Sequence, residues 1–172
     1  MAGHETTATG LAWTLDLLVR HPDVFERARD GSETYLKAVV SESLRLRPVV
    51  PLAGRRLAVP LEVDGLSLPV GTDVTPAMWL THTRPEEYPE PYAFRPERFL
   101  ENPPSTYTWI PFGGGVRRCI GAPFAELEMR VVLGEVLERF DLRPAGRGAE
   151  GIARRNVTFS PRHGTRVIAT PR

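Results

Sequence analysis

The stretch that decides the fold reads Pro111-Phe112-Gly113-Gly114-Gly115-Val116-Arg117-Arg118-Cys119-Ile120-Gly121. Cys119 is the only cysteine in a chain of 172 residues, so no disulfide can form within the chain. Glycines crowd the same stretch, and glycine reaches backbone conformations that are closed to other residues. Cys119 is therefore a buried apolar residue, a reactive thiol or a metal ligand.

A helix is expected directly after this stretch. Pro123 suits the first turn of a helix, where a missing N–H costs nothing. Apolar residues at helical spacing then predict a helix over residues 122–140; they are Ala125, Met129, Val132, Val136 and Phe140. The unpaired N–H groups at a helix start favour negative charge, and the thiolate is the form of cysteine that binds metals. The position of Cys119 just before this helix therefore favours a thiolate.

The same stretch has the pattern F-x-x-G-x-R-x-C-x-G, formed by Phe112, Gly115, Arg117, Cys119 and Gly121. From the composition, chance would place these companions around the only cysteine at a rate of roughly four in a hundred thousand. The pattern resembles the haem-ligand loop of the cytochrome P-450 family, in its bacterial style. The resemblance implies that Cys119 is the axial thiolate ligand, and so the metal ligand, of haem b (iron protoporphyrin IX). It also implies that Arg117 pairs with a haem propionate and that Phe112, Gly113 and Gly121 bind the cofactor. A buried structural cysteine in a glycine-rich turn is the alternative.

Directly after Met1, the chain reads Ala2-Gly3-His4-Glu5-Thr6-Thr7, which resembles the family's oxygen-binding segment (A/G)-G-x-(D/E)-T-T. The resemblance implies that Ala2 and Gly3 lie beside the haem, where small residues leave room for dioxygen. It gives catalytic roles to Thr6, as a hydrogen-bond donor to bound dioxygen, and to Glu5, as a proton relay. A helix-capping glutamate followed by two threonines is the alternative. The segment is not an H-E-x-x-H zinc motif, because Ala8 stands where the second histidine is needed.

Charged residues elsewhere match further parts of the family's pattern. Glu42 and Arg45 form an E-x-x-R sequence, whose spacing puts both on one face of a helix expected over residues 32–47. Such pairs are usually solvated ion pairs on the surface. By resemblance, Arg98 in the P-x-R-F segment joins them in a buried structural triad. Arg56 is identified by resemblance as a second propionate partner, with neighbouring Arg55 as the competing candidate.

The remaining segments complete a mixed fold. Apolar residues at helical spacing predict a distal oxygen-binding helix over 1–20. Short β-like runs predict an antiparallel meander over 55–78, and a terminal hairpin is expected over 152–170. Prolines predict an irregular proximal wrap, neither helix nor sheet, over 81–118. The expected fold class is mainly α with small antiparallel β (α+β), in a single partial domain over 1–172. By resemblance this is the C-terminal part of the cytochrome P-450 fold, with the N-terminal half absent.

The composition indicates the class of protein and the cellular compartment to expect. With 41% hydrophobic and 25% charged residues, it is typical of one soluble globular unit. No apolar run approaches the roughly 18 to 20 residues of a membrane span, so none is expected. A lone cysteine is typical of a reducing compartment, which predicts a cytoplasmic location. Arginines outnumber acidic residues after Phe140, but we expect solvated surface charge there and no nucleic-acid partner.

The resemblance implies an enzyme, a haem-thiolate monooxygenase. Such an enzyme inserts one oxygen atom of O2 into an apolar small-molecule substrate, with electrons from a ferredoxin- or flavodoxin-type donor. Two alternatives stay open, a truncated haem-binding module without turnover and an inert fragment. Glu5 and Thr6 favour the oxygenase over the haem-binding module, because a haem carrier does not require them.

Overall fold

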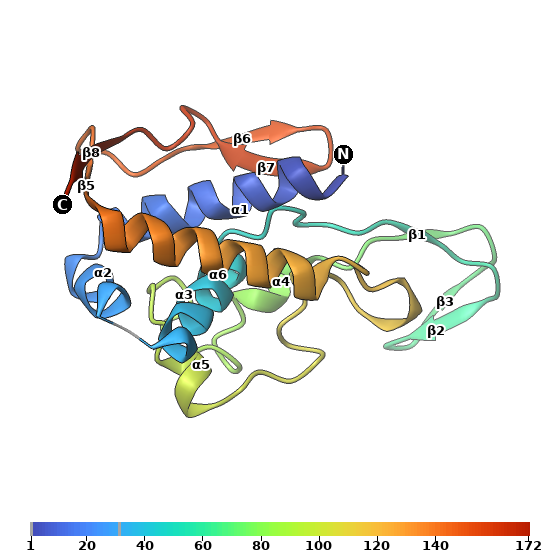
Figure 1. The fold of residues 1–172 in the computed structure, drawn as a ribbon. Coiled ribbons are helices and arrows are strands. Elements are labelled where there is room, and N and C mark those ends of the chain that lie inside the picture. Colours follow the sequence, from blue (N-terminus) through green and yellow to red (C-terminus); the bar gives the residue numbers. More distant parts are fainter. Residues whose placement is uncertain (1, 31) are drawn as a thin grey trace.

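The computed structural model describes residues 2–30 and 32–172, apart from the side chain of Ala2, and Figure 1 shows its elements. The helices are α1 (Ala2–Val19), α2 (Pro22–Arg29), α3 (Glu33–Leu46), α4 (Met78–His82), α5 (Arg98–Glu101) and α6 (Ala122–Arg139), with a 3-10 turn η1 (Gly115–Arg117). The strands are β1 (Arg55–Arg56), β2 (Leu61–Val63), β3 (Leu66–Leu68), β4 (Asp73–Val74), β5 (Phe140–Pro144), β6 (Ile152–Arg155), β7 (Thr158–Pro161) and β8 (Val167–Pro171). The expected class, mainly α with small antiparallel β, is confirmed.

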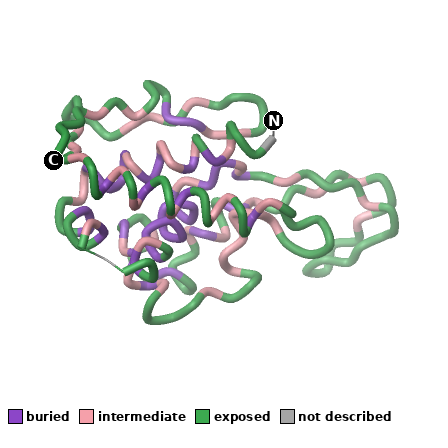
Figure 2. Tube along the Cα trace, viewed as in Figure 1, coloured by how far each residue is buried: buried purple, intermediate pink, exposed green. Residues whose placement is uncertain are grey.

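Helices α1, α3 and α6 form the packed body of the molecule, where most buried residues gather (Figure 2). Val39 of α3 and Met129 of α6 are almost fully buried in one apolar core. Helices α1 and α6 approach closely at Gly10, where a Cβ would lie only 3.1 Å from Met129 Cε. A hydrogen bond of 2.8 Å between Thr14 Oγ1 and Ser43 Oγ joins α1 to α3. These three helices position the residues of the candidate site.

The segment 55–78 does not form the expected meander. β2 pairs with β3, and β1 pairs with β4, so one short hairpin is nested inside another. The β-like run expected over residues 57–63 contains Pro60, and a proline has no N–H for a ladder, so the strand there begins only at Leu61. Met78 begins α4 and does not end a strand. The inner hairpin stands apart from the helical body (Figure 1) and is mostly exposed (Figure 2).

The pairing expected for the terminal hairpin over 152–170 is also wrong. β6 pairs with β7 around a turn at Asn156, whose φ is 53°. β8 pairs with β5, the strand that follows α6 directly. Asparagine tolerates this left-handed conformation better than most residues, so the chain reverses there. The β6–β7 hairpin is tied to α1, because Trp13 Nε1 donates to Phe159 O at 3.0 Å.

The stretch 81–118 is irregular over most of its length, as its prolines predict. It nevertheless contains the end of α4, the short helix α5 and the turn η1. Tyr88 and Phe94 are buried within it. The proximal wrap is therefore packed against the helical body.

Two further features concern the charge of the surface and the character of the helices. All seven arginines after Phe140 are exposed, as expected for solvated charge; they are Arg143, Arg147, Arg154, Arg155, Arg162, Arg166 and Arg172. Within residues 2–30 and 32–172, none of the helices has the length and apolar character needed to cross a bilayer.

Candidate functional site

The loop that carries Cys119 is closed by its own backbone. Cys119 N–H donates to Phe112 O at 2.9 Å, and Gly113 N–H donates to Ile110 O at 2.9 Å. Residues 112–119 thus form a tight turn that leads into α6, whose N-cap residue is Gly121. The thiol therefore lies just before the N-terminal turn of an 18-residue helix, where unpaired N–H groups favour a thiolate.

Two glycines of the loop have backbone conformations that other residues rarely adopt. Gly113 has a φ of 72° and Gly115 a φ of 62°. A Cβ at Gly114 or Gly115 would meet nothing within 4 Å, so this side of the loop is open to a group from outside the chain. A Cβ at Gly121 would lie 3.9 Å from Cys119 Sγ. The glycines thus shape the turn and keep the backbone accessible.

The surroundings of the thiol are apolar and accessible. Cys119 is a free, exposed cysteine. Val116 and Ile120 beside it are fully exposed, at 103% and 100%, and Phe124 in the first turn of α6 is 70% exposed. Exposed apolar side chains around a soft sulfur ligand suit an apolar, metal-containing group that would cover them.

A hollow of about 600 Å³ adjoins the glycine run of the loop. Arg55 and Arg118 are among its lining residues. The side chain of Arg56 binds Asp73 instead of lining the hollow. Its Nε and Nη2 donate to the two carboxylate oxygens of Asp73, both at 2.9 Å, across the β1–β4 pair. Successive residues of a strand point to opposite faces, so Arg55 and Arg56 cannot both face the hollow. The structure therefore favours Arg55 over Arg56 as an anion partner, while Arg117 is exposed on η1.

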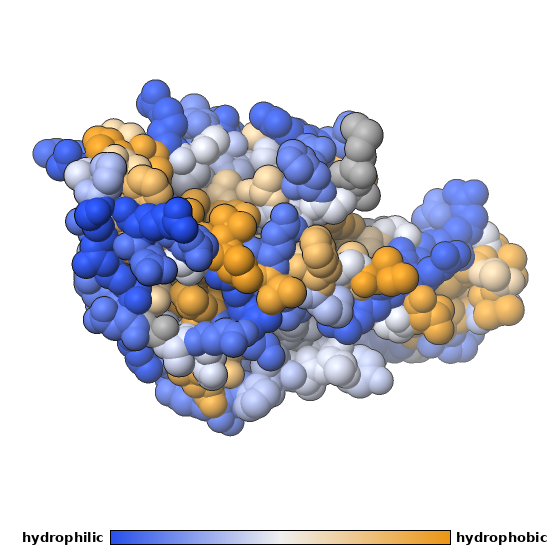
Figure 3. Space-filling model, in the orientation of Figure 1, coloured by the Kyte–Doolittle hydropathy of each residue, from blue (hydrophilic) through white to orange (hydrophobic). Residues whose placement is uncertain are grey.

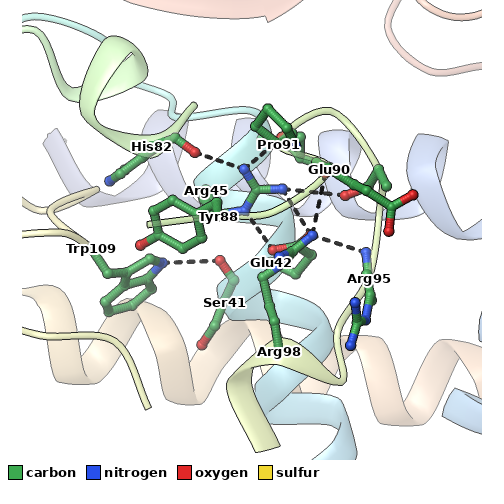
Figure 4. Close-up of polar contacts among 12 residues, drawn as sticks. Ser41, Glu42, Arg45, His82, Tyr88, Glu90, Pro91, Arg95, Arg98 and Trp109 are labelled. Carbon is green, nitrogen blue, oxygen red and sulfur yellow. Dashed lines mark hydrogen bonds and ion pairs between the residues drawn. The ribbon is translucent and has the colours of Figure 1, made fainter. Parts of the chain in front are cut away.

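The structure brings Glu42, Arg45 and Arg98 together (Figure 4). Arg45 Nε donates to Glu42 Oε2 at 2.7 Å, and Arg45 Nη2 donates to Glu42 Oε1 at 2.9 Å. Arg98 Nε donates to Glu42 Oε1 at 3.0 Å. Glu42 and Arg45 are fully buried and Arg98 is 9% exposed. This cluster is therefore unlike the solvated pair that an isolated E-x-x-R sequence usually forms.

Backbone carbonyls complete the cluster, which holds two cations for one carboxylate. Arg45 Nη1 donates to His82 O and to Pro91 O, both at 2.7 Å, and Arg98 Nη1 donates to Pro89 O at 3.2 Å. A buried charge is tolerated only where its hydrogen-bonding groups are satisfied, and these carbonyls serve that purpose. The cluster thereby fixes the start of the proximal wrap against α3.

Two residues that sequence reasoning missed connect the wrap to the cysteine loop. Trp109 Nε1 donates to Ser41 O at 3.1 Å, and the Trp109 ring meets the Phe112 ring edge-on at 6.2 Å between centroids. His82, which is fully buried, accepts a hydrogen bond at Nε2 from Ile110 N–H at 2.9 Å. In the sequence, the signal that could have identified Trp109 is its position as an aromatic residue just before the cysteine motif. The sequence His82-Thr83-Arg84-Pro85 matches the family's H-R-D-P only in part, so it predicted no role.

The segment that resembles the family's oxygen-binding pattern, residues 2–7, forms the first two turns of α1. A Cβ at Gly3 would meet nothing within 4 Å, and Glu5 is exposed. Thr6 is half-buried, and its hydroxyl donates to Gly3 O at 3.2 Å. The side chain of Ala2 lies outside the described part of the chain. Gly3 and Glu5 are thus accessible to a molecule bound outside the chain.

Comparison with known proteins identifies the family. The family model described as cytochrome P-450 matches residues 1–163. Cytochrome P-450 137 of Mycobacterium tuberculosis is 44% identical over 175 residues, which are 99% of this chain and 37% of that protein. Cytochrome P-450 135B1 of Mycobacterium bovis is 44% identical over 177 residues, which are 97% of this chain and 38% of that protein. The chain belongs to the cytochrome P-450 family.

Solved structures agree with this assignment. A 6-coordinated cytochrome P-450 from Thermus thermophilus matches with a TM-score of 0.85 and 38% identity, over 99% of this chain and 45% of that one. The retinoic acid bound cyanobacterial CYP120A1 matches with a TM-score of 0.88 and 31% identity, over 99% of this chain and 43% of that one. The expected cytochrome P-450 fold is thus confirmed, and the chain spans less than half the length of these relatives.

The residues present fit the haem that the family implies. Cys119 offers an exposed sulfur in an apolar surrounding, which suits iron at the centre of a flat macrocycle. Arg117 and Arg55 offer planar cations for carboxylate groups such as haem propionates. Cys119 would hold the iron, and these arginines would hold the propionates.

Proposed function

We propose that this chain provides the ligand loop and the oxygen-binding segment of a haem-thiolate monooxygenase. In that reaction one oxygen atom of O2 enters a C–H bond of an apolar substrate, and the other leaves as water. The balance requires two electrons, which a ferredoxin- or flavodoxin-type donor would supply, and two protons, which come from water. The observation that supports this most strongly is the accessible Cys119 at the start of α6, within the family's complete ligand pattern. The lone cysteine also supports a cytoplasmic location.

The residues of the chain divide the work between them. Haem b, when bound, supplies the oxygen-activating chemistry through an iron that Cys119 ligates. A thiolate at Cys119 donates electron density, and the start of α6 stabilises its charge. The exposed Glu5 carboxylate takes protons from water, and the Thr6 hydroxyl holds and passes a proton one residue further along α1. Gly3 leaves space for dioxygen on the surface of α1.

The buried triad has a positioning role in this proposal. Glu42, Arg45 and Arg98 hold α3 and the proximal wrap together, and the wrap leads into the cysteine loop. None of the three is exposed enough to meet substrate. They act on the reaction by keeping Cys119 where a haem can reach it.

A second candidate is a haem-binding module without coupled turnover. The exposure of Glu5 favours it, because productive oxygen activation requires a site from which water is excluded. In such a module the electrons reduce dioxygen to hydrogen peroxide. The two candidates therefore differ in where the electrons go, while both require haem on Cys119.

Isotopically labelled dioxygen separates the two candidates. The chain would be loaded with haem and supplied with reduced ferredoxin, its reductase and an apolar probe substrate. The monooxygenase predicts labelled oxygen in the product. Haem retained on Cys119 without any label in the product, even when labelled hydrogen peroxide replaces the dioxygen and the donor, would contradict the monooxygenase and leave the haem-binding module.

A further inference from the structure

His82, the last residue of α4, lies beside Arg45 of the buried triad (Figure 4). Its carbonyl oxygen accepts a hydrogen bond from Arg45 Nη1 at 2.7 Å. Its ring Nε2 accepts a hydrogen bond from Ile110 N–H at 2.9 Å. The residue is fully buried, so water does not compete for either contact. One residue thus contacts the triad through its backbone and the entry to the loop through its side chain.

The geometry also fixes the state of the ring. A backbone N–H can only donate, so Nε2 of His82 is an acceptor and the neutral ring carries its proton on Nδ1. Burial lowers the pKa of His82 to about 4. Within the described residues, Nδ1 is buried without a hydrogen-bond partner, so the ring is held in place by its contact with Ile110.

Ile110 is in turn coupled to the thiol by two backbone hydrogen bonds. Ile110 O accepts from Gly113 N–H, and Phe112 O accepts from Cys119 N–H, both at 2.9 Å. The turn between them is tight, so a displacement of Ile110 moves the frame in which Cys119 sits. A continuous set of contacts therefore runs from Arg45 through His82 and Ile110 to Cys119.

We propose that His82 is a positioning residue for the thiolate, and that its Nε2 fixes the entry of the cysteine loop relative to the triad. The proposal rests on the proposed function of Cys119 as a haem ligand. A histidine that only filled space in the core would need the right volume. A positioning histidine needs an acceptor at the place of Nε2, and this difference can be tested.

Two polar substitutions separate the two roles. In His82→Gln the side-chain oxygen reaches the place of Nε2 and can accept from Ile110 N–H. In His82→Asn the amide is one carbon shorter and cannot reach it. We expect amide hydrogen exchange at Ile110 and Cys119 of the haem-free chain to be faster in His82→Asn than in the wild type, roughly fivefold or more for one lost hydrogen bond. We expect His82→Gln to stay near the wild type.

The same variants are then loaded with haem, reduced and treated with carbon monoxide. We expect a smaller share of the thiolate-type band in His82→Asn than in His82→Gln, which should match the wild type. Equal exchange rates in the two variants, or equal band shares, would overturn the proposal, as would loss of the fold in both, since glutamine supplies the acceptor. A wild type without any thiolate-type band would refute the proposed function instead, and the exchange rates would still test His82.

Discussion

At the scale of single residues, Glu42 is the acceptor on which the buried cluster depends. Its two oxygens accept hydrogen bonds from Arg45, Arg98 and the Arg95 N–H, the last at 2.9 Å. Without this carboxylate, two guanidinium groups would remain in the interior with only carbonyl oxygens around them. An uncompensated buried charge is among the most destabilising changes in a protein. The sequence shows only the spacing of Glu42 and Arg45, whereas the structure shows that both side chains are buried.

We expect Glu42→Ala to lower the free energy of unfolding by about 3 to 5 kcal/mol, as for other broken buried pairs. The matched control is Glu135→Ala, which breaks an exposed pair with Arg139 on α6, 2.6 Å long. That control should change stability by less than about 1 kcal/mol. Urea unfolding followed by circular dichroism would measure both. Similar small losses in the two variants would show that the buried cluster contributes no more than a surface pair.

His82 predicts how stability depends on pH. Its pKa is lowered from 6.5 to about 4 in the folded chain, mainly by burial. The unfolded chain therefore binds the proton more readily, and stability falls as pH drops from about 6.5 toward 4, by up to about 3 kcal/mol. Below this range both states are protonated and the contribution is constant. Urea unfolding across this range should show a shallower slope in His82→Gln; parallel slopes would contradict the buried neutral ring.

At the scale of elements, the contact between α1 and α6 depends on one missing side chain. A Cβ at Gly10 would lie 3.1 Å from Met129 Cε and 3.2 Å from its Sδ, closer than ordinary packing allows. A Cβ at Gly134 of α6 would lie 3.6 Å from Leu36 Cδ1, an ordinary contact. Both glycines are inside helices, where alanine is intrinsically preferred. The two positions thus differ only in the space around them.

We expect Gly134→Ala to stabilise the chain by about 0.5 to 1 kcal/mol, the usual helix preference of alanine over glycine. Gly10→Ala should gain less or lose stability, because its new methyl group must displace Met129. Thermal and urea unfolding of the two variants would measure the difference. An equal gain in both would mean that α1 and α6 are free to move apart at Gly10.

The helices could be predicted from sequence more fully than the strands, for a physical reason. The stripe from Ala125 to Val136 repeats with the helical period, so α6 was expected within one residue of its observed end. Strand pairing depends on where the chain turns, and the Asn156 turn is a single residue with no repeating signal. β5 was also hidden, because Phe140 completed the apolar stripe of the preceding helix.

The site divides in the same way. The cysteine loop and the triad were recognised by their resemblance to the family's patterns, so Cys119, Glu42 and Arg45 could be proposed as site residues in advance. The choice between Arg55 and Arg56 depends on which face of β1 each occupies, and no residue type reveals that. His82 and Trp109 act through contacts with distant backbone atoms, which only the folded chain brings near.

At the scale of the whole molecule, apolar side chains are exposed over a wide area. Figure 3 shows them gathered along the line of α6. The exposed apolar residues of this helix are Phe124, Leu127, Val131 and Val132. Continuous exposed apolar surface of this kind favours association.

We expect the haem-free chain to self-associate as its concentration rises. The double variant Leu127→Gln and Val131→Gln should shift the chain toward the monomer, since it removes apolar area without removing a core contact. Arg139→Gln, on the same helix, is the control and should leave association unchanged. Size-exclusion chromatography with light scattering would measure the mass; a wild type that is monomeric at every concentration would contradict this expectation.

Ligation of haem iron by Cys119 is tested most directly by the absorption spectrum of the haem-loaded chain after reduction and addition of carbon monoxide. We predict a thiolate-type band in the wild type, its loss in Cys119→Ser, and its retention in Val116→Ser, a change at a fully exposed position of the same loop. A serine hydroxyl is a poor ligand and supplies no thiolate charge to the iron. An unchanged thiolate-type band in Cys119→Ser, or stable haem binding without that band in the wild type, would contradict the assignment.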